Sequence, residues 1–456
     1  MLTDLWRTAG LDDAALGEVT LTGAEPVLPS SFAVGTAAQA SIAASALAAG
    51  ELWRLRTGRR QRVAVDMRAA AIEFRSERYL RVDGKVPAEY HDSIAGLYCC
   101  GDGRWVRLHT NLPHHCSGLL QLLGCAHDRE AVQRALDRWK AEALEDAAAA
   151  AGLVVTACRT FAEWDEHAQG RAVAALPPFS IEQIGDAPAE PLPATERPLS
   201  GIKVLDLTRI IAGPVCGRTL AAHGADVLLV TASHLPSMRP LVIDTGRGKL
   251  STSIDLRDQS GRESLAALVR GADVFVQGYR PGAVAAFGFA PEQIAKLRPG
   301  IVYVSLCAYG HAGPWAGRRG FDSLVQTASG FNAAEAQAFG QSKPRELPAQ
   351  ELDHATGYLL AFAAMTALKR RAERGGSWHV RCSLAQTGYW LRSLGRIGGT
   401  QCPDPRSADV RDLLEETPSG FGRLTTVRHA ATMSETPPRW ARQSVPLGTH
   451  PAAWPD

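Results

Sequence analysis

The sequence has no hydrophobic run long enough to cross a membrane, and its first residues carry acid and base without the apolar core of a signal peptide. Its net charge is only +2 over 456 residues, which gives no argument for nucleic acid or an anionic membrane surface as a partner. Nine cysteines, an odd number without CxxC spacing, indicate reduced thiols rather than a disulfide framework. We therefore expect a cytoplasmic protein that binds neither membrane nor nucleic acid.

Several catalytic motifs are also missing. The strand expected at residues 203–207 is not followed by GxGxxG, which disfavours a nicotinamide dehydrogenase. Residues 244–249 (DTGRGK) lack the first glycine and the hydroxyl residue of a phosphate-binding P-loop. The sequence also contains no GxSxG motif, which disfavours an α/β-hydrolase. His114, His115 and Cys116 are adjacent, and adjacent side chains rarely converge on one ion, so we predict no metal site.

What the sequence does contain, beyond residue 198, is an alternation of short apolar strands and helices. This alternation predicts an α/β fold with a parallel sheet that is covered on both faces, and its ligand crevice lies at the carboxyl ends of the strands. Proline-rich residues 171–197 are expected to form a linker. We therefore divide the chain into residues 1–196, a sheet domain at 197–395, and a tail at 396–456 that wraps the surface or is partly disordered.

Asp353 stands directly before an Ala- and Leu-rich run at residues 355–372, which ends at Gly375 and is followed by an alternating strand pattern. This order predicts a helix with Asp353 as its N-cap, a glycine stop and a strand. The helix dipole and free N–H groups at that position favour an ionised carboxylate. Asp353 is thus either a structural cap or a carboxylate nucleophile.

A similar helix, glycine turn and strand occur near the N-terminus. Gly375 lies 317 residues after Gly58 (375 − 58), and the same offset places Thr36 opposite Asp353. The first copy therefore lacks the carboxylate, and we expect Thr36 to be chemically silent.

A series of short motifs between residues 198 and 392 resembles the family III CoA-transferases, the formyl-CoA transferase and carnitine CoA-transferase group. The motifs occur in the family's order, at residues 198–209 (PLSGIKVLDLTR), 212–214 (AGP), 224–227 (GADV), 248–249 (GK), 254–256 (IDL), 272–274 (ADV), 280–282 (RPG), 320–322 (GFD), 329–330 (SG) and 353–357 (DHATG). Segments that resemble the later part of the same family come first in this chain, at residues 57–63, 102–106 and 161–164. The resemblance therefore implies a rearranged or fused family unit, with the small-domain portion in residues 1–196.

The resemblance implies a Rossmann-like CoA-binding domain and a smaller α+β domain, assembled as a homodimer. It also implies that Asp353 attacks an acyl-CoA, gives an acyl-aspartyl anhydride and then an aspartyl-CoA thioester, and passes CoA to a carboxylic acid. No permanently bound cofactor is implied, because CoA is a substrate. The CoA contacts that we expect by this comparison are Arg209, Ile210, Lys249, Ile254, Tyr279, Arg280 and Gly282.

The sequence departs from the family pattern at two CoA-binding positions, where Ala232 and Ala286 replace basic residues. A non-catalytic CoA-binding partner subunit is therefore the main alternative to a transferase. An acyl-CoA racemase or isomerase is a third reading, but its histidine would fall near Phe321, which cannot transfer a proton.

Overall fold

The computed structural model describes residues 1–88 and 91–455, and its main body is a seven-stranded sheet in the order β10-β9-β8-β11-β12-β13-β7. Six strands are parallel and β7 pairs antiparallel with β13. The bounds are β7 Phe179–Gly185, β8 Lys203–Leu207, β9 Asp226–Thr231, β10 Lys249–Ser253, β11 Val274–Gln277, β12 Val302–Cys307 and β13 Ser377–Ser383. The predicted α/β fold with a large parallel sheet is confirmed.

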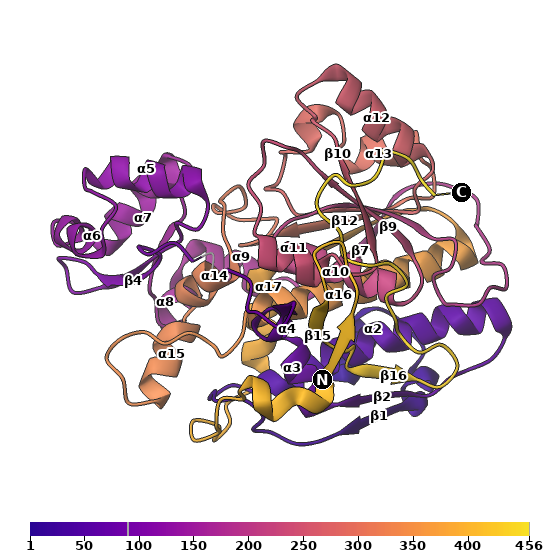
Figure 1. The fold of residues 1–456 in the computed structure, drawn as a ribbon, viewed down its shortest axis with the longest axis horizontal. Coiled ribbons are helices and arrows are strands. Elements are labelled where there is room, and N and C mark those ends of the chain that lie inside the picture. The colour runs from indigo at the N-terminus through magenta and orange to yellow at the C-terminus, as the bar shows by residue number, and fades with distance from the viewer. Residues whose placement is uncertain (89–90, 456) are drawn as a thin grey trace.

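Helices cover both faces of this sheet (Figure 1). Adjacent residues of a strand point to opposite faces, so Val204 joins the core beneath α10 and α16, while Leu205 joins the core beneath α12 and α13. The chain order reverses between β8 and β11, which opens a crevice at their carboxyl ends. The covering helices are α10 Ala212–Ala222, α11 Arg239–Thr245, α12 Gln259–Arg270, α13 Pro291–Leu297, α16 Glu351–Arg374 and α17 Leu384–Ser393.

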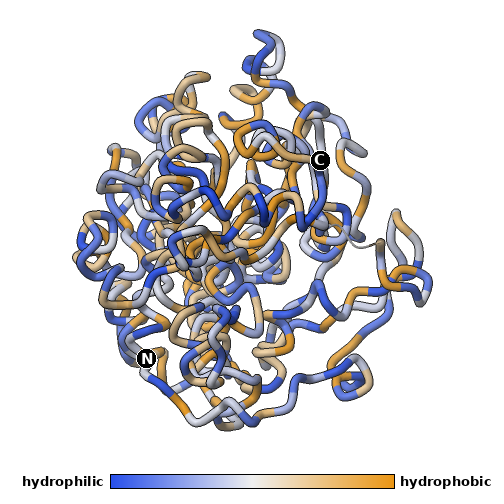
Figure 2. Tube along the Cα trace, turned by 90° about the vertical axis from the view of Figure 1, so that its left-hand side faces the viewer, coloured by the Kyte–Doolittle hydropathy of each residue, from blue (hydrophilic) through white to orange (hydrophobic). Residues whose placement is uncertain are grey.

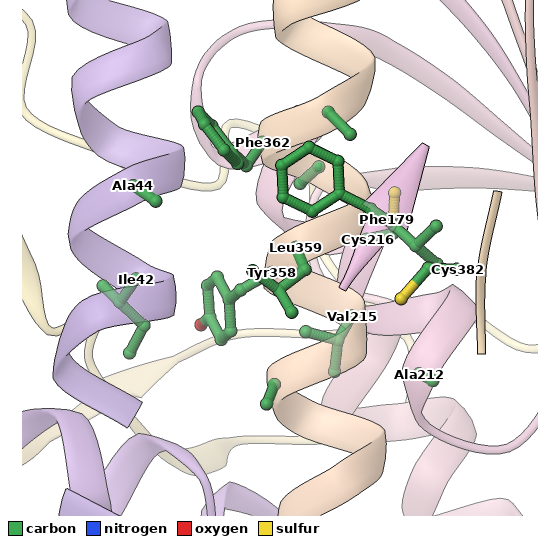
Figure 3. Close-up of a cluster of buried hydrophobic side chains, with 14 of the residues drawn as sticks. Ile42, Ala44, Phe179, Ala212, Val215, Cys216, Tyr358, Leu359, Phe362 and Cys382 are labelled. Carbon is green, nitrogen blue, oxygen red and sulfur yellow. The ribbon is translucent and has the colours of Figure 1, made fainter. Parts of the chain in front are cut away.

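Helix α16 is buried along nearly all of its length, because it lies between α10 on one side and the N-terminal helix α2 (Val34–Thr57) on the other (Figure 3). Tyr358 and Phe362 of α16 belong to the same core as Ile42 of α2 and Val215 of α10. Gly357 permits the contact with α10, since a Cβ there would lie 2.6 Å from the backbone oxygen of Ala212. The start of α16 is therefore held rigidly against the sheet.

The structure reproduces the sequence repeat with matching element bounds. Helix α2 begins at Val34 and α16 at Glu351, an offset of 317 (351 − 34), and each has 24 residues. The same offset relates α3 (Met67–Glu73) to α17. In both copies a strand, β2 (Val63–Asp66) or β13, joins the long helix to the next one.

A smaller α+β unit lies to one side of the sheet (Figure 1). Its three strands, β4 (Gly96–Cys99), β5 (Trp105–Leu108) and β6 (Val155–Ala157), pack on helices around a separate core. We call residues 94–157 the small subdomain. Its helices are α5 Pro113–Leu123, α6 Arg129–Leu136 and α7 Ala141–Ala150.

The structure corrects the predicted domain boundaries in two places. The proposed linker at 171–197 contains β7, because Phe179 and Ile181 alternate with polar residues and pair with β13. Residues 1–82 pack on the sheet domain through α2 rather than on the small subdomain, so residues 1–196 do not form one unit. The tail also has more regular structure than predicted, with η3 Ser407–Leu413, β14 Leu414–Thr417, β15 Leu424–Val427 and β16 Ala431–Met433.

The remaining elements connect these parts, and Figure 2 shows that short hydrophobic stretches alternate with hydrophilic ones along the chain. Within residues 1–88 and 91–455, no helix combines the length and apolar character needed to span a bilayer. The connecting elements are α1 Leu2–Thr8, η1 Asp13–Glu18, β1 Val19–Thr22, α4 Ser76–Tyr79, β3 Arg81–Val82, α8 Phe161–Glu166, α9 Ala168–Ala174, η2 Ala285–Phe287, α14 Asp322–Ala328 and α15 Phe331–Ala338.

Candidate active site

A cavity of about 420 Å³ opens at the carboxyl ends of β8, β11 and β12, where the sequence predicted the ligand crevice. Leu207, Gly278 and Cys307 mark these three strand ends in its wall. Asp353 also lines the cavity, with a side chain that is buried except for this opening (7% exposed). We call it the Asp353 cavity.

The sequence predicted Asp353 as the N-cap of its helix, and the structure shows that this prediction is wrong. Gln350 is the N-cap, so Asp353 is the third residue of α16 and lies within its first turn. Its backbone N–H donates a 2.9 Å hydrogen bond to Oδ2 of Asp322, the first residue of α14. Asp322 thus provides the cap, which leaves the Asp353 carboxyl free of that task.

The pKa of Asp353 is also shifted in the direction opposite to the one that the helix start predicts. Burial raises the pKa of Asp353 well above its ordinary value, and the nearby charges of Asp322 and Glu77 raise it further. Burial likewise raises the pKa of Asp322 to about 6, although hydrogen bonds to its carboxylate oppose this shift. Desolvation and like charges therefore outweigh the helix dipole, and they favour the protonated form of Asp353.

Glu77 of α4 connects this acid pair to the N-terminal part of the chain. Its Oε2 lies 3.3 Å from Nε2 of His354, the residue after Asp353. Burial alone would raise the pKa of Glu77, but the hydrogen bond and charge of His354 lower it overall. Glu77 is therefore an ionised neighbour that favours the neutral form of Asp353.

Four arginines line the cavity, and three of them give it an excess of positive charge, because among the described residues only the fourth, Arg318, pairs with an acid, Asp146 at 2.9 Å. Arg209, Arg280 and Arg319 line it, and within the described ranges none has an acidic side chain within 4.0 Å. Arg209 and Arg319 donate only to backbone oxygens, of Pro236 and Gly152. Burial lowers the pKa of both guanidinium groups without removing their charge. The cavity is therefore suited to a ligand with several negative charges.

Ile210 and Tyr279, two further predicted contacts, also line the Asp353 cavity. Ile210 has a positive φ of 75°, which is unusual for a β-branched residue and typical of backbone that is strained at a functional site. Tyr279 also borders a second, mostly apolar slot of about 110 Å³, in which the predicted contact Ile254 lies beside Ala232. Because both spaces share Tyr279 and Leu207, they can hold two ends of one elongated ligand.

Lys249 and Gly282 do not lie in the walls of either space. Nζ of Lys249 is buried and donates to Oδ2 of Asp206 at 2.8 Å and to the backbone oxygen of Pro214 at 2.7 Å. The structure therefore places Lys249 beneath the sheet edge, where its buried ammonium pairs with Asp206 and does not reach the cavity. Gly282 forms a turn with φ of 85° after Arg280, and it shapes the cavity only through its neighbours.

The small subdomain supplies cavity residues that the sequence did not assign. Leu112, His114 and His115 come from the start of α5, and Arg319 comes from the loop before α14. The adjacent histidines are the sequence signal at this position, and their pattern indicates possible metal ligands rather than a cavity wall. Their contact with Asp353's cavity depends on how two distant parts of the chain pack, which local sequence patterns do not reveal.

One group of possible metal ligands occurs within the described part of the chain, and it lies outside the cavity. Ligand atoms of Asp92, Cys116 and His127 are within 4.8 Å of one another. Asp92 already accepts hydrogen bonds from His127 at 2.8 Å and Thr110 at 2.8 Å. These contacts explain the cluster as a polar link between Asp92, which precedes the small subdomain, and residues within it.

Comparison with known proteins agrees with this geometry. The family model of CoA-transferase family III matches residues 9–190 and 199–395. An acetyl-coenzyme A transferase of Hypoxylon pulicicidum is 32% identical over 329 residues, which are 66% of this chain and 55% of that protein. An acyl-CoA transferase of Gibberella moniliformis is 33% identical over 315 residues, 64% of this chain and 55% of that protein. A probable fatty acyl-CoA transferase of Mycobacterium tuberculosis is 33% identical over 231 residues, 46% and 58% of the two chains. The chain thus spans about half the length of the curated relatives that it matches.

Proposed function

Because the chain belongs to CoA-transferase family III, we propose that it moves CoA from an acyl-CoA donor to a carboxylic acid acceptor, with Asp353 as nucleophile. One observation supports this most directly: the Asp353 carboxyl lies in the wall of a cavity lined by four arginines, three of which lack acidic partners among the described residues. CoA carries phosphate groups and a thioester, so one ligand satisfies both features of the cavity.

In the proposed reaction, the ionised carboxylate of Asp353 attacks the thioester carbonyl carbon. The C–S bond breaks, CoA leaves as a thiolate, and an acyl-aspartyl anhydride remains. The thiolate attacks the aspartyl carbonyl, which releases the donor acid and gives an aspartyl-CoA thioester. The acceptor carboxylate then attacks this thioester to form a second anhydride, and CoA thiolate attacks its acceptor carbonyl, which frees Asp353.

The surroundings of Asp353 suit this chemistry for two reasons. Burial removes water from the carboxylate, which strengthens it as a nucleophile and protects the anhydride from hydrolysis. The hydrogen bond from its backbone N–H to Asp322 fixes the start of α16, so the carboxyl is positioned before the substrate arrives. Within this proposal, Arg209 and Arg280 bind CoA phosphates, and the slot beside Ile254 and Tyr279 receives the apolar face of the adenine.

The test is to incubate the protein with a panel of acyl-CoAs, trap with hydroxylamine, and locate the modification by mass spectrometry. We expect a hydroxamate at Asp353 and none in Asp353→Asn. If CoA binds but no acyl-CoA in a broad panel modifies Asp353, the protein is the CoA-binding partner subunit instead. The mass of the particle in solution tests the homodimer that this proposal includes.

A racemase or isomerase is a second candidate, because the cavity contains His115 as well as Asp353. Such a pair can in principle remove and return an α-proton. Burial lowers the pKa of His115 to about 3, which makes it a poor base and favours the transferase. Exchange of the substrate's α-proton in deuterated water, without any acceptor acid, would identify the racemase.

A further inference from the structure

His115 is a buried side chain in the wall of the Asp353 cavity, and its polar atoms have no partners. It is 3% exposed, and both of its ring nitrogens lack a hydrogen-bond partner within the described residues. Buried polar atoms in proteins are nearly always paired, so an unpaired ring in a cavity wall needs an explanation. A substrate atom that enters the cavity can supply the missing partner.

The ring is neutral in this environment. Burial lowers the pKa of His115 to about 3, and the positive charges of His114, Arg319 and Arg209 contribute to the same shift. A neutral imidazole carries one N–H donor and one acceptor nitrogen. Such a ring can polarise a carbonyl oxygen by hydrogen bonding while it keeps its own proton.

The start of α5 places this ring. Leu112 is extended and Pro113 begins the helix, so that His114 and His115 lie in its first turn. Phe321 lies against His115 with ring centroids 6.1 Å apart, and the exposed His114 ring lies 4.1 Å from it. The nitrogens of His115 are covered, so a substrate reaches them only if a neighbouring side chain turns aside.

We propose that His115 is a catalytic residue whose N–H donates to the thioester carbonyl oxygen that Asp353 attacks. This inference rests on the proposed function. As the bond from Asp353 to the carbonyl carbon forms, negative charge develops on that oxygen, and a fixed donor stabilises it. The C–S bond then breaks and the electron pair leaves with the CoA sulfur. His115 donates a hydrogen bond throughout and transfers no proton.

The experiment compares His115→Phe, which removes both nitrogens, with His115→Gln, which keeps an N–H donor. Rapid quenching and mass spectrometry measure how fast the Asp353 adduct forms in a single turnover. We expect a loss of about 10²- to 10³-fold in His115→Phe, and at most about tenfold in His115→Gln. His109→Phe is the matched control, because His109 is a half-buried histidine of the same subdomain that stacks on Phe321 at 4.0 Å and is not among the residues that line the cavity.

Equal adduct rates in wild type and His115→Phe would overturn the inference, and so would an inactive His115→Gln, which would indicate proton transfer. If the wild type itself forms no adduct, the proposed function fails, and the inference is judged by binding. His115→Phe should then bind a thioester analogue at least about tenfold more weakly while its affinity for free CoA is unchanged. If His115→Phe loses affinity equally for the thioester analogue and for free CoA, or for neither, the inference about His115 is contradicted.

Discussion

The backbone N–H of Asp353 donates to Oδ2 of Asp322 at 2.9 Å, so that two acidic side chains meet where α16 and α14 begin. The contact positions Asp353, and it also brings a second carboxyl close enough to raise its pKa. Positioning and protonation of the candidate nucleophile are therefore linked through one neighbour.

This link predicts how adduct formation depends on pH. The carboxylate of Asp353 is the attacking form, and its pKa is raised, so the rate should still increase with pH above the range in which an ordinary aspartate titrates. Asp322→Asn keeps an oxygen for the Asp353 N–H and removes the like charge. We expect its rate to begin rising at lower pH than in wild type, measured as Asp353 adduct formation from pH 5 to pH 9. An unchanged profile in Asp322→Asn would show that Asp322 does not control the ionisation of Asp353.

The same acid predicts a change in stability. Because the pKa of Asp353 is higher in the folded than in the unfolded chain, the folded protein holds an extra proton, and stability falls as pH rises above about 4. Asp353→Asn removes this loss. We expect the variant to exceed wild type by about 1 to 3 kcal/mol at pH 8, and by much less at pH 4, in denaturant unfolding. A constant difference at both pH values would instead indicate a packing effect.

The N-terminal copy repeats the acid contact without the nucleophile. There the backbone N–H of Thr36 donates to Oε1 of Glu25 at 2.7 Å, just as that of Asp353 donates to Asp322. We therefore expect one adduct per chain, and Thr36→Asp should create no second one, because Thr36 does not line the Asp353 cavity where the acyl-CoA is proposed to bind. Mass spectrometry after trapping counts the adducts, with Thr36→Ser as the control. A hydroxamate at position 36 in Thr36→Asp would show that the first copy keeps a working site.

Local patterns were enough to predict the alternation of strands and helices, the position of the crevice and the repeat that relates α2 to α16. They placed Asp353 near a helix start, but which residue caps that helix depends on Asp322, 31 positions earlier (353 − 322). Local sequence patterns could not reveal the role of Lys249 either, because its pairing with Asp206 forms only when β8, β10 and α10 pack together. The contribution of α5 to the cavity likewise arises from tertiary packing.

Lys249 is therefore predicted to affect folding rather than CoA recognition. Lys249→Met leaves the Asp206 carboxylate buried without its cation, which should cost about 3 to 5 kcal/mol of stability. The double variant Asp206→Asn with Lys249→Met removes both charges and should recover most of this loss in denaturant unfolding. Both variants, where folded, should bind CoA within about threefold of wild type. A large loss of CoA affinity in a stable double variant would restore Lys249 as a ligand contact.

Arg209 and Arg280 should by contrast affect binding and leave folding intact, because neither pairs with an acidic side chain in the described ranges. Each substitution to alanine removes one uncompensated positive charge from the cavity wall. We expect CoA to bind about 10- to 100-fold more weakly in each variant, as charge-assisted contacts to phosphate contribute about 1.5 to 3 kcal/mol. Isothermal titration at two salt concentrations measures this, and wild type should lose more affinity in high salt than either variant. Arg134→Ala is the control, since Arg134 is exposed on α6 and pairs only with Glu130 at 3.6 Å. If CoA affinity and its salt dependence are the same in all three variants as in wild type, CoA phosphates do not bind in this cavity.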